Sequence, residues 1–339
     1  MVEGLDMAVI VPCFNEEQTV GQVVRSFAEA LPTARIYVYD NNSTDRTAEL
    51  AAEAGAVVRR AARQGKGNVV RRMFADVEAD IYVMVDGDDQ LDASAAPRLV
   101  QCLVHDQLDM VTGVRVAEHA SVHRSGHAFG NRMMSGLVSR LFGRPVADVF
   151  SGYRVFSRRF VKSFPVLSEG FEIETELTVH AMELKLPVGE APVGFRARPE
   201  GNPSKLSTLR DGLRILWTIG RLVQRERPLP FYGAIAAGLA SLSIVLAVPL
   251  VITFLQTSMV PRFPTAILCS AIMLGAFLSL TAGLILDTVT HHRRETRLLE
   301  YLRIPSLASV LEARAQPRQE PLEEAEAPRA VPRTVATTG

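Results

Sequence analysis

The residues whose types and spacing best suit catalysis are aspartates in the segment IYVMVDGDDQLD, residues 81–92. The apolar residues 81–85 predict a buried strand, and the carboxylates follow at its end. Because side chains alternate along an extended chain, Asp86 and Asp88 should project from the same side. Two hard oxygen donors in this arrangement suit Mg²⁺ or Mn²⁺, ions that usually arrive with substrate phosphates. The alternative is a solvated acidic turn, in which packed carboxylates without a cation would repel one another.

Other loops in the first half of the chain carry polar residues that suit a nucleotide sugar. Residues 7–12 and 35–39 predict two strands, and the residues that follow them could hydrogen-bond a base and a ribose. The segment RQGKGN, residues 63–68, offers close backbone approach at its glycines and a cation at its lysine. Each residue alone could equally belong to an ordinary turn or helix cap. The candidate donor-binding residues are Pro12, Phe14, Glu16, Asp40, Gly65, Lys66 and Asp86.

Short apolar strands alternate with helical segments in this part of the chain. Strands are expected at residues 7–12, 35–39, 56–58 and 81–85, with a helix between each strand and the next. This alternation predicts an α/β fold with a doubly wound, mainly parallel sheet. Ligands bind such sheets at the carboxyl ends of the strands, where the polar loops of this chain should lie.

The composition narrows the range of partners. The chain has 339 residues, with 37 Lys and Arg residues and 37 Asp and Glu residues, so its formal net charge is zero. No long basic stripe interleaved with aromatic residues is present, so nucleic acid is not an expected partner. The cysteines Cys13, Cys102 and Cys269 lack the spacing of a zinc site or a disulfide framework. The N-terminus does not show the pattern of a signal peptide.

Two later segments are long and apolar enough to cross a membrane. Residues 231–255 and 265–286 contain 25 and 22 residues without a charge, and about 20 apolar residues span a hydrocarbon core. A buried helical hairpin of a soluble protein is the alternative. Arginines cluster before the first segment and after the second, whereas Arg262 alone lies between them. The positive-inside rule therefore predicts a multi-pass protein of the inner membrane, with the catalytic domain and both termini cytoplasmic.

An amphipathic helix is expected over residues 207–224, directly before the first span. Its basic residues gather on one face and its apolar residues on the other. This pattern predicts a helix that lies in the membrane interface, and a salt-bridged surface helix is the alternative. The basic face comprises Arg210, Arg214, Arg221 and Arg225.

These elements divide the chain into five consecutive parts. The tail is assigned as disordered because it is rich in Pro, Glu, Ala and Thr. We expect a catalytic domain at residues 1–204, the interfacial helix at 205–228, two transmembrane helices with a short loop at 229–290, a basic helix at 291–312 and the tail at 313–339.

The motifs of the first half resemble, in order and spacing, the nucleotide-binding half of family-two inverting glycosyltransferases with the GT-A fold. These motifs are VPCFNEE, YDNNSTDRT, RQGKGN and DGDDQ. The second half looks like the polyprenyl-phosphate glycosyltransferases, which include dolichyl-phosphate mannose synthases and bacterial undecaprenyl-phosphate sugar transferases. The resemblance covers roughly residues 6–290. Its second-half motifs are Arg124 with Asn131, DVFSGYRVF at 148–156, FEIETE at 171–176 and SKL at 204–206.

The resemblance implies transfer of a sugar from a nucleotide diphosphate to a polyprenyl phosphate, with inversion at the anomeric carbon. The anionic acceptor phosphate would need positioning more than a strong base, and Arg and Lys are the usual phosphate partners. Arg154 could instead anchor its loop through Asp148, and Lys205 could face lipid headgroups. The candidate catalytic residues are Asp86, Asp88, Gln90, Arg124 and Arg154, and the candidate acceptor-phosphate residues are Arg124, Arg154 and Lys205.

Some assignments stay open. Glu174 could orient a sugar hydroxyl, or it could share the exposed face of a strand with Glu172 and Glu176. A processive polysaccharide synthase would need more spans and a QxxRW motif, which the sequence lacks. A non-enzymatic membrane scaffold with a nucleotide-binding domain would not require the acid pair. The expected partners are a nucleotide sugar, a polyprenyl phosphate, the bilayer and further copies of the chain in a homo-oligomer.

Overall fold

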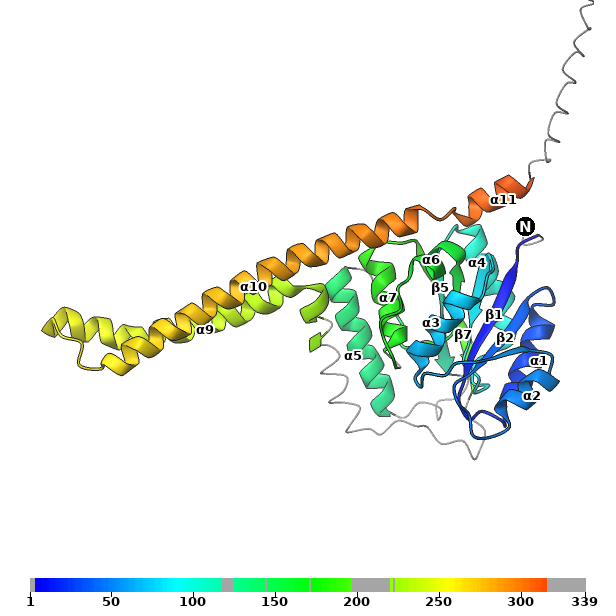
Figure 1. The fold of residues 1–339 in the computed structure, drawn as a ribbon, viewed down its shortest axis with the longest axis horizontal. Helices are drawn as coiled ribbons and strands as arrows, with labels where there is room; N and C mark the ends of the chain where they lie inside the picture. Colours follow the sequence, from blue (N-terminus) through cyan, green and yellow to red (C-terminus); the bar gives the residue numbers. More distant parts are fainter. Residues whose placement is uncertain are drawn as a thin grey trace, which may run out of the picture.

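The structure is a computed structural model and describes residues 4–117, 125–143, 145–170, 172–196, 220–221 and 223–315. The described residues between 4 and 196 form a domain built on one sheet, and we call it the sheet domain. A long pair of helices projects away from this domain, and the second helix of the pair returns to it (Figure 1).

Seven strands form the sheet: β1 (Met7–Cys13), β2 (Arg35–Asp40), β3 (Val57–Arg60), β4 (Ile81–Met84), β5 (Met110–Ala117), β6 (Arg154–Ser157) and β7 (Val188–Phe195). Their order across the sheet is β3-β2-β1-β4-β6-β5-β7. The first four strands pair in parallel, as do β5 and β7, whereas β6 runs antiparallel to β4 and β5. The prediction of an α/β fold with a mainly parallel sheet is confirmed.

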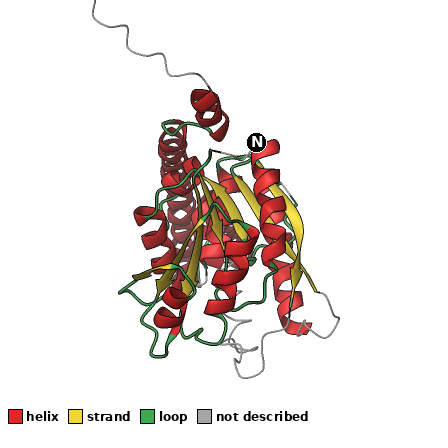
Figure 2. Ribbon diagram, turned by 90° about the vertical axis from the view of Figure 1, so that its right-hand side faces the viewer, coloured by secondary structure: helices red, strands yellow, loops and turns green. Residues whose placement is uncertain are grey.

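Helices cover both faces of the sheet (Figure 2). One face packs against α1 (Val20–Ala30), α2 (Thr47–Glu53) and α4 (Ala96–His105). The other face packs against α3 (Lys66–Asp76), α6 (Arg158–Ser163) and α7 (Ile173–Glu183). The remaining long helix of the domain, α5 (Ser125–Phe142), contacts α7.

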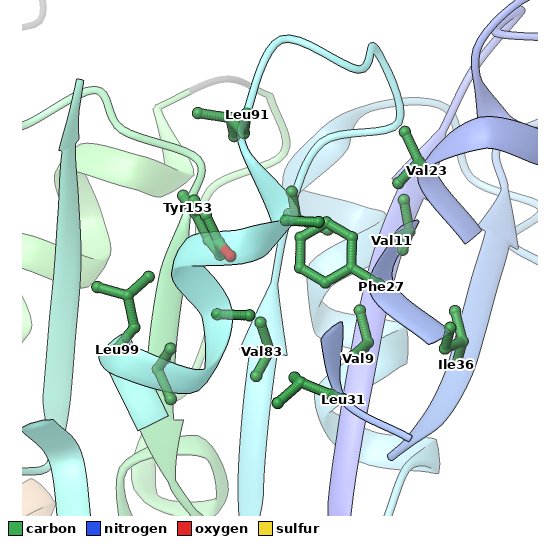
Figure 3. Packing of buried hydrophobic residues seen from close by; sticks show 14 of the residues in the cluster. Val9, Val11, Val23, Phe27, Leu31, Ile36, Val83, Leu91, Leu99 and Tyr153 are labelled. Atoms are coloured by element: carbon green, nitrogen blue, oxygen red, sulfur yellow. The ribbon is translucent and has the colours of Figure 1, made fainter. Parts of the chain in front are cut away.

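Alternation along the central strands separates the two apolar cores. Val9 and Val11 of β1 point to the first face, where they pack with Val83 and with Phe27 of α1 (Figure 3). Ile10, between them, belongs to the core on the opposite face. Because all five side chains are almost completely buried, the ends of β1 and β4 are held rigidly. The loops that follow these strands therefore start from fixed positions.

The projecting pair consists of α9 (Pro228–Thr257) and α10 (Phe263–Leu302). Both helices are long and apolar enough to span a membrane, and most of their apolar surface faces outward. Small residues line their contact, where the Ser243 hydroxyl donates to the Cys269 carbonyl at 2.8 Å. The Ser279 hydroxyl likewise donates to the Tyr232 carbonyl at 3.0 Å. We call this pair the membrane hairpin.

The hairpin is attached to the sheet domain through an ionic cluster that we call the membrane joint, formed by the acids Glu183 and Glu226, whose side chains are buried, and by the partly buried Arg294 and Arg297. The Glu183 carboxylate at the end of α7 lies 2.7 Å from Arg294 Nε and 2.9 Å from Arg297 Nη1 of α10. Arg294 also donates to the Glu226 carbonyl at 2.9 Å. The two parts of the chain are therefore held together by charge-assisted hydrogen bonds.

The end of α10 makes a second attachment, which we call the C-terminal clamp and which consists of Asp109, Arg159 and Tyr301. The Tyr301 hydroxyl donates to Asp109 Oδ2 at 2.7 Å. The Arg159 guanidinium binds the same carboxylate at 2.6 and 2.9 Å and lies 4.5 Å from the centre of the Tyr301 ring. Tyr301 itself is buried in the core beside α6 and α7.

The segment after the clamp differs from the expected boundaries. Instead of a separate helix at 291–312, residues 291–302 continue α10. A second helix, α11 (Leu307–Ala315), then packs its apolar residues against the core of the first face. Most of the expected interfacial helix, residues 207–219, and residues 316–339 of the expected tail lie outside the described residues.

Candidate functional site

The acid pair lies directly after β4, at the carboxyl edge of the sheet. Asp88 is buried, whereas the Asp86 side chain is 31% exposed and so remains open to a ligand. The Thr19 hydroxyl of the α1 start donates to the Gly87 carbonyl at 2.6 Å and fixes the turn between the two acids. Beneath the turn, burial and then the neighbouring acids raise the pKa of the Cys13 thiol, which keeps this sulfur neutral.

Lys66 joins this edge to α7. Its ammonium nitrogen lies 2.5 Å from Asp86 Oδ1 and 2.5 Å from Glu174 Oε1. Burial alone would lower the pKa of Lys66, but the two carboxylates raise it above its ordinary value. Lys66 is therefore a charged ammonium that lies between two acids. We call Lys66, Asp86, Asp88 and Glu174 the catalytic edge.

Two glycines permit the close approaches at this edge. Gly65 has a φ of +119°, and a Cβ there would overlap the Glu169 carbonyl. Gly152, in the loop before β6, lies so close to the Asp86 carboxylate that a Cβ would overlap it. A side chain at either position would displace Lys66 or Asp86.

The candidate donor-binding residues of the first two strands gather beside the catalytic edge. Glu16 and Asp40 are both buried, and Asp40 accepts from the Ser43 amide at 3.2 Å. Sequence reasoning missed Asn41, whose side chain accepts from the Gly65 amide at 2.8 Å and donates to the carbonyls of residues 61 and 63. Asn41 thus ties the loop after β2 to the Lys66 loop.

Glu174 lies in a helix. The alternative that the FEIETE segment forms an exposed strand face is therefore wrong. Glu174 occupies the first turn of α7, and its carboxylate is buried. Glu176 accepts from the backbone amides of Leu167 and Ser168 at 3.0 and 2.8 Å, so it holds the preceding loop. The three glutamates therefore do not share an exposed face.

Arg154 is fully buried, which does not fit its assignment to the acceptor phosphate. Its guanidinium donates to the backbone carbonyls of Val149, Ser151 and Glu174 at 2.8 to 3.0 Å, and burial lowers its pKa to about 10. Arg154 thus anchors the loop before β6, which agrees with the alternative interpretation of this residue. It does not act through Asp148, which pairs with Arg115 at 2.7 Å.

The remaining candidates are divided between the described and the undescribed parts of the chain. Gln90 lies beside the acid pair and donates to the Arg196 carbonyl at 3.2 Å. Pro12 and Phe14 lie partly exposed at the end of β1. Arg124 and Lys205 fall outside the described residues.

The carboxylates of the catalytic edge fit a hard divalent ion. Magnesium-type ions are commonly held by one or two carboxylates together with substrate phosphates and water. The ammonium of Lys66 contacts Asp86 Oδ1, which shows that the surroundings of this oxygen stabilise a positive charge. Within the described ranges no group of three or more His, Cys, Asp or Glu residues is arranged as a metal cage. Asp86 and Asp88 would therefore hold the ion jointly with the donor.

The chain is similar to known glycosyltransferases. Residues 8–164 match the family described as Glycosyl transferase family 2. An uncharacterized glycosyltransferase of Mycobacterium tuberculosis is 32% identical over 212 residues, which cover 62% of this chain and 94% of that protein. Glycosyltransferase AglJ of Haloferax volcanii is 28% identical over 299 residues, 87% of this chain and 98% of AglJ. A dolichyl-phosphate hexose transferase of the same organism is 27% identical over 222 residues, 66% of this chain and 96% of that protein.

A solved structure shares the fold. Glucosyl-3-phosphoglycerate synthase from Mycobacterium tuberculosis, in complex with Mn²⁺, UDP-glucose and phosphoglyceric acid, superposes with a TM-score of 0.54 at 24% identity, covering 66% of this chain and 80% of that chain. The GT-A prediction is therefore confirmed, as is the predicted family. The chain belongs to glycosyl transferase family 2 and is a glycosyltransferase.

Proposed function

We propose that this glycosyltransferase moves a sugar from a nucleotide diphosphate sugar to a polyprenyl phosphate at the cytoplasmic face of the inner membrane. The observation that carries the proposal is helix α7. Glu174 in its first turn contacts Lys66 of the catalytic edge, and Glu183 in its last turn binds the arginines of α10. At 1.5 Å per residue these glutamates lie only about 13 Å apart along the helix. One short helix thus connects the catalytic edge to the base of the hairpin, an arrangement that suits an acceptor embedded in the membrane.

The likeness to lipid-directed enzymes supports the same acceptor. One relative is named a dolichyl-phosphate hexose transferase, and dolichyl phosphate is a polyprenyl-type phosphate. AglJ matches most of this chain, including part of the region of the hairpin, because the similarity covers 87% of it. A soluble acceptor would not require two helices that are able to span a membrane.

The donor would bind across the ends of β1, β2 and β4. Pro12, Phe14, Glu16 and Asp40 would frame the base and ribose, and the Gly65 loop would approach the diphosphate closely. Lys66 would contact the diphosphate and stabilise the charge that develops as the nucleotide leaves. A bound Mg²⁺ or Mn²⁺ supplies further neutralisation of that leaving group.

The acceptor phosphate would attack the anomeric carbon directly. A phosphate monoester has a second pKa near ~6, so it is largely anionic at neutral pH and needs no strong protein base. Arg124 and Lys205 are the candidates that would hold it. Lys205→Ala should raise the acceptor KM or lower kcat by about 10- to 100-fold, because a charge-assisted hydrogen bond is lost. Unchanged donor affinity, measured by calorimetry, would separate this role from one at the diphosphate.

The orientation follows from the arginines around the hairpin. Arg293, Arg294 and Arg297 lie at the end of α10 that joins the sheet domain, whereas Arg262 precedes the opposite end of the same helix. By the positive-inside rule the arginine-rich end, and with it the sheet domain, would lie in the cytoplasm.

A transfer assay tests the proposal. Purified protein in bilayers would receive a panel of radiolabelled nucleotide sugars with undecaprenyl phosphate or dolichyl phosphate, and the products would be separated as lipid and water-soluble fractions. We expect one donor to label the lipid with a single sugar. A ladder of longer products would indicate a processive synthase. Nucleotide-sugar binding without transfer to any lipid phosphate would contradict the proposal.

A further inference from the structure

A lysine side chain balances negative charge at the catalytic edge. Lys66 Nζ contacts one oxygen of Asp86 and one oxygen of Glu174, each at 2.5 Å. The Lys66 and Glu174 side chains are only 10% and 6% exposed, so water screens their interaction weakly. Burial raises the pKa of Glu174, and Lys66 counteracts this effect. The lysine therefore replaces solvent as the partner of both acids.

Asp86 is also the carboxylate that would hold the divalent ion. Its Oδ2 lies close to Gly152, where a Cβ would overlap it, and its Oδ1 contacts Lys66 Nζ. A divalent ion and an ammonium cannot both contact Oδ1 without strong repulsion at that distance. One of the two cations must therefore leave Asp86 Oδ1 when the other binds this oxygen.

Glu174 offers the place to which Lys66 can withdraw. Among the described residues, Glu174 Oε2 is buried and has no hydrogen-bond partner, although the other oxygen of this carboxylate, Oε1, contacts Lys66. The carboxylate is held in the first turn of α7, while the lysine has a flexible four-carbon stem. The ammonium can therefore release Asp86, keep Glu174 and turn toward a ligand over the edge.

We propose that Lys66 is a built-in counter-ion of Asp86, which yields its place to the divalent ion only when a nucleoside diphosphate arrives and receives the displaced ammonium. This inference rests on the proposed nucleotide-sugar donor. A divalent ion alone would meet the ammonium and bind weakly. A diphosphate brings negative charge for both cations, so ion and nucleotide should each raise the affinity for the other by the same factor.

Mn²⁺ titration followed by the electron paramagnetic resonance signal of the free ion tests this exchange without turnover. The full chain in detergent would be titrated with Mn²⁺ alone and with Mn²⁺ plus UDP or GDP, as wild type, Lys66→Met and Arg72→Met. Arg72 lies exposed on α3, the helix that begins at Lys66, so its replacement is the matched loss of one positive charge.

We expect Lys66→Met to bind Mn²⁺ alone at least about tenfold more tightly than wild type, because the competing cation is gone. Nucleotide should strengthen Mn²⁺ binding to wild type and to Arg72→Met, but much less to Lys66→Met. Mn²⁺ affinity that Lys66→Met leaves unchanged or lowers would overturn the exchange. If Lys66→Met fails to fold, a wild-type Mn²⁺ affinity that is insensitive to both nucleotides overturns it instead.

Glu174→Gln provides an opposite variant. Without the Glu174 carboxylate the released ammonium would have the diphosphate as its only anionic partner, so it should remain on Asp86 for longer and weaken Mn²⁺ binding in the presence of nucleotide. Nucleotide coupling equal to wild type in this variant would contradict the role of Glu174. None of these measurements uses a lipid acceptor. If the exchange is observed but no sugar is transferred to a lipid phosphate, the proposed acceptor is rejected and the role of Lys66 is retained. If sugar is transferred but the exchange is not observed, the role of Lys66 is rejected and the proposed acceptor is retained.

Discussion

The catalytic edge and the membrane joint are both largely buried clusters of opposite charges, but their charge balance differs. At the edge one ammonium, that of Lys66, faces the carboxylates of Asp86 and Glu174, and Asp88 lies two residues away. At the joint the guanidinium groups of Arg294 and Arg297 bind the carboxylate of Glu183, and Glu226 supplies a second carboxyl group beside them. The edge has an excess of negative charge and a partly exposed member, so it can accept a cation. The joint has its charges satisfied within the protein, so it serves attachment.

The largest effect should come from the acids of the edge. Asp86→Asn or Asp88→Asn should lower sugar transfer by about 10²-fold or more, because the charge that holds the divalent ion is lost. The initial rate in the transfer assay measures this effect. Glu49→Gln, which removes an exposed acid on α2, is the control and should retain full activity. Normal turnover by both aspartate variants in a chelator-treated preparation would show that the edge needs no ion.

A substitution in the joint should act differently, because it should change the position of the catalytic edge relative to the membrane and not the groups that react. Glu183→Gln leaves two partly buried arginines without their carboxylate, and breaking a buried pair costs at most about 3–5 kcal/mol. We expect transfer to long-chain polyprenyl phosphate in bilayers to fall by about tenfold, because small misplacements of a site reduce rates strongly. Transfer to a short, soluble prenyl phosphate and donor affinity should change little.

Glu300→Gln is the matched control for the joint, since Glu300 forms an exposed ion pair with Arg303 at the end of the same helix α10. It should leave both acceptors unaffected. Equal losses on the long and the short acceptor in Glu183→Gln would point to a damaged catalytic edge and would remove the distinction between the two clusters.

Much of the catalytic edge could be predicted from sequence because each of its loops directly follows a strand. In a parallel sheet such loops meet at one edge, so Asp40, Lys66 and Asp86 could be grouped without coordinates. The helical position of Glu174 was the exception, because three glutamates at alternate positions are also typical of a strand. Ile173, Leu177 and Ala181, spaced by four residues and all buried on α7, are the helical signal in the same segment.

The attachments between the two parts of the molecule could not be predicted in this way. Glu183 and Arg294 are 111 residues apart, and Asp109 and Tyr301 are 192 apart. Neither pair forms a motif, and each depends on α10 continuing beyond the apolar span. The burial of Arg154 is similar, because its partners are backbone carbonyls, which any sequence provides. Long-range ionic contacts of this kind require the fold.

Glu226 gives the joint a dependence on pH. Burial and the neighbouring Glu183 raise the pKa of Glu226 to about 7, against the opposing effect of Arg297, Arg225 and Arg293. The folded protein therefore holds a proton on Glu226 more tightly than the unfolded chain does. This contribution to stability is present at low pH and is lost as the pH rises toward 7.

Glu226→Gln keeps the protonated shape and removes the titration. The variant should resemble wild type near pH 5 and should be more stable than wild type by about 1–2 kcal/mol at pH 8. Thermal melting of both proteins at the two pH values measures the difference. Glu295→Gln, at an exposed position of α10, should show no such divergence. A stability difference between Glu226→Gln and wild type that is the same at both pH values would contradict a raised pKa at the joint.

The smallest expected effect concerns the C-terminal clamp, where one hydrogen bond can be removed without the surrounding contacts. Tyr301→Phe deletes the hydroxyl that binds Asp109, but Asp109 keeps its bonds from Arg159 and from the Ser157 hydroxyl. The ring beside the Arg159 guanidinium also remains. We therefore expect a loss of about 1 kcal/mol, or about 2–4 °C in melting temperature for a domain of this size, with unchanged transfer.

Tyr301→Ala removes the ring as well and should destabilise the clamp by about 3–5 kcal/mol, as large deletions in a core do. If the clamp works with the joint to hold the sheet domain over the membrane, Tyr301→Ala should selectively impair transfer to the long-chain acceptor, as Glu183→Gln does. It should also expose residues 303–306, between α10 and α11, to protease. A Tyr301→Ala protein that resists protease and uses both acceptors normally would show that the joint alone positions the catalytic edge.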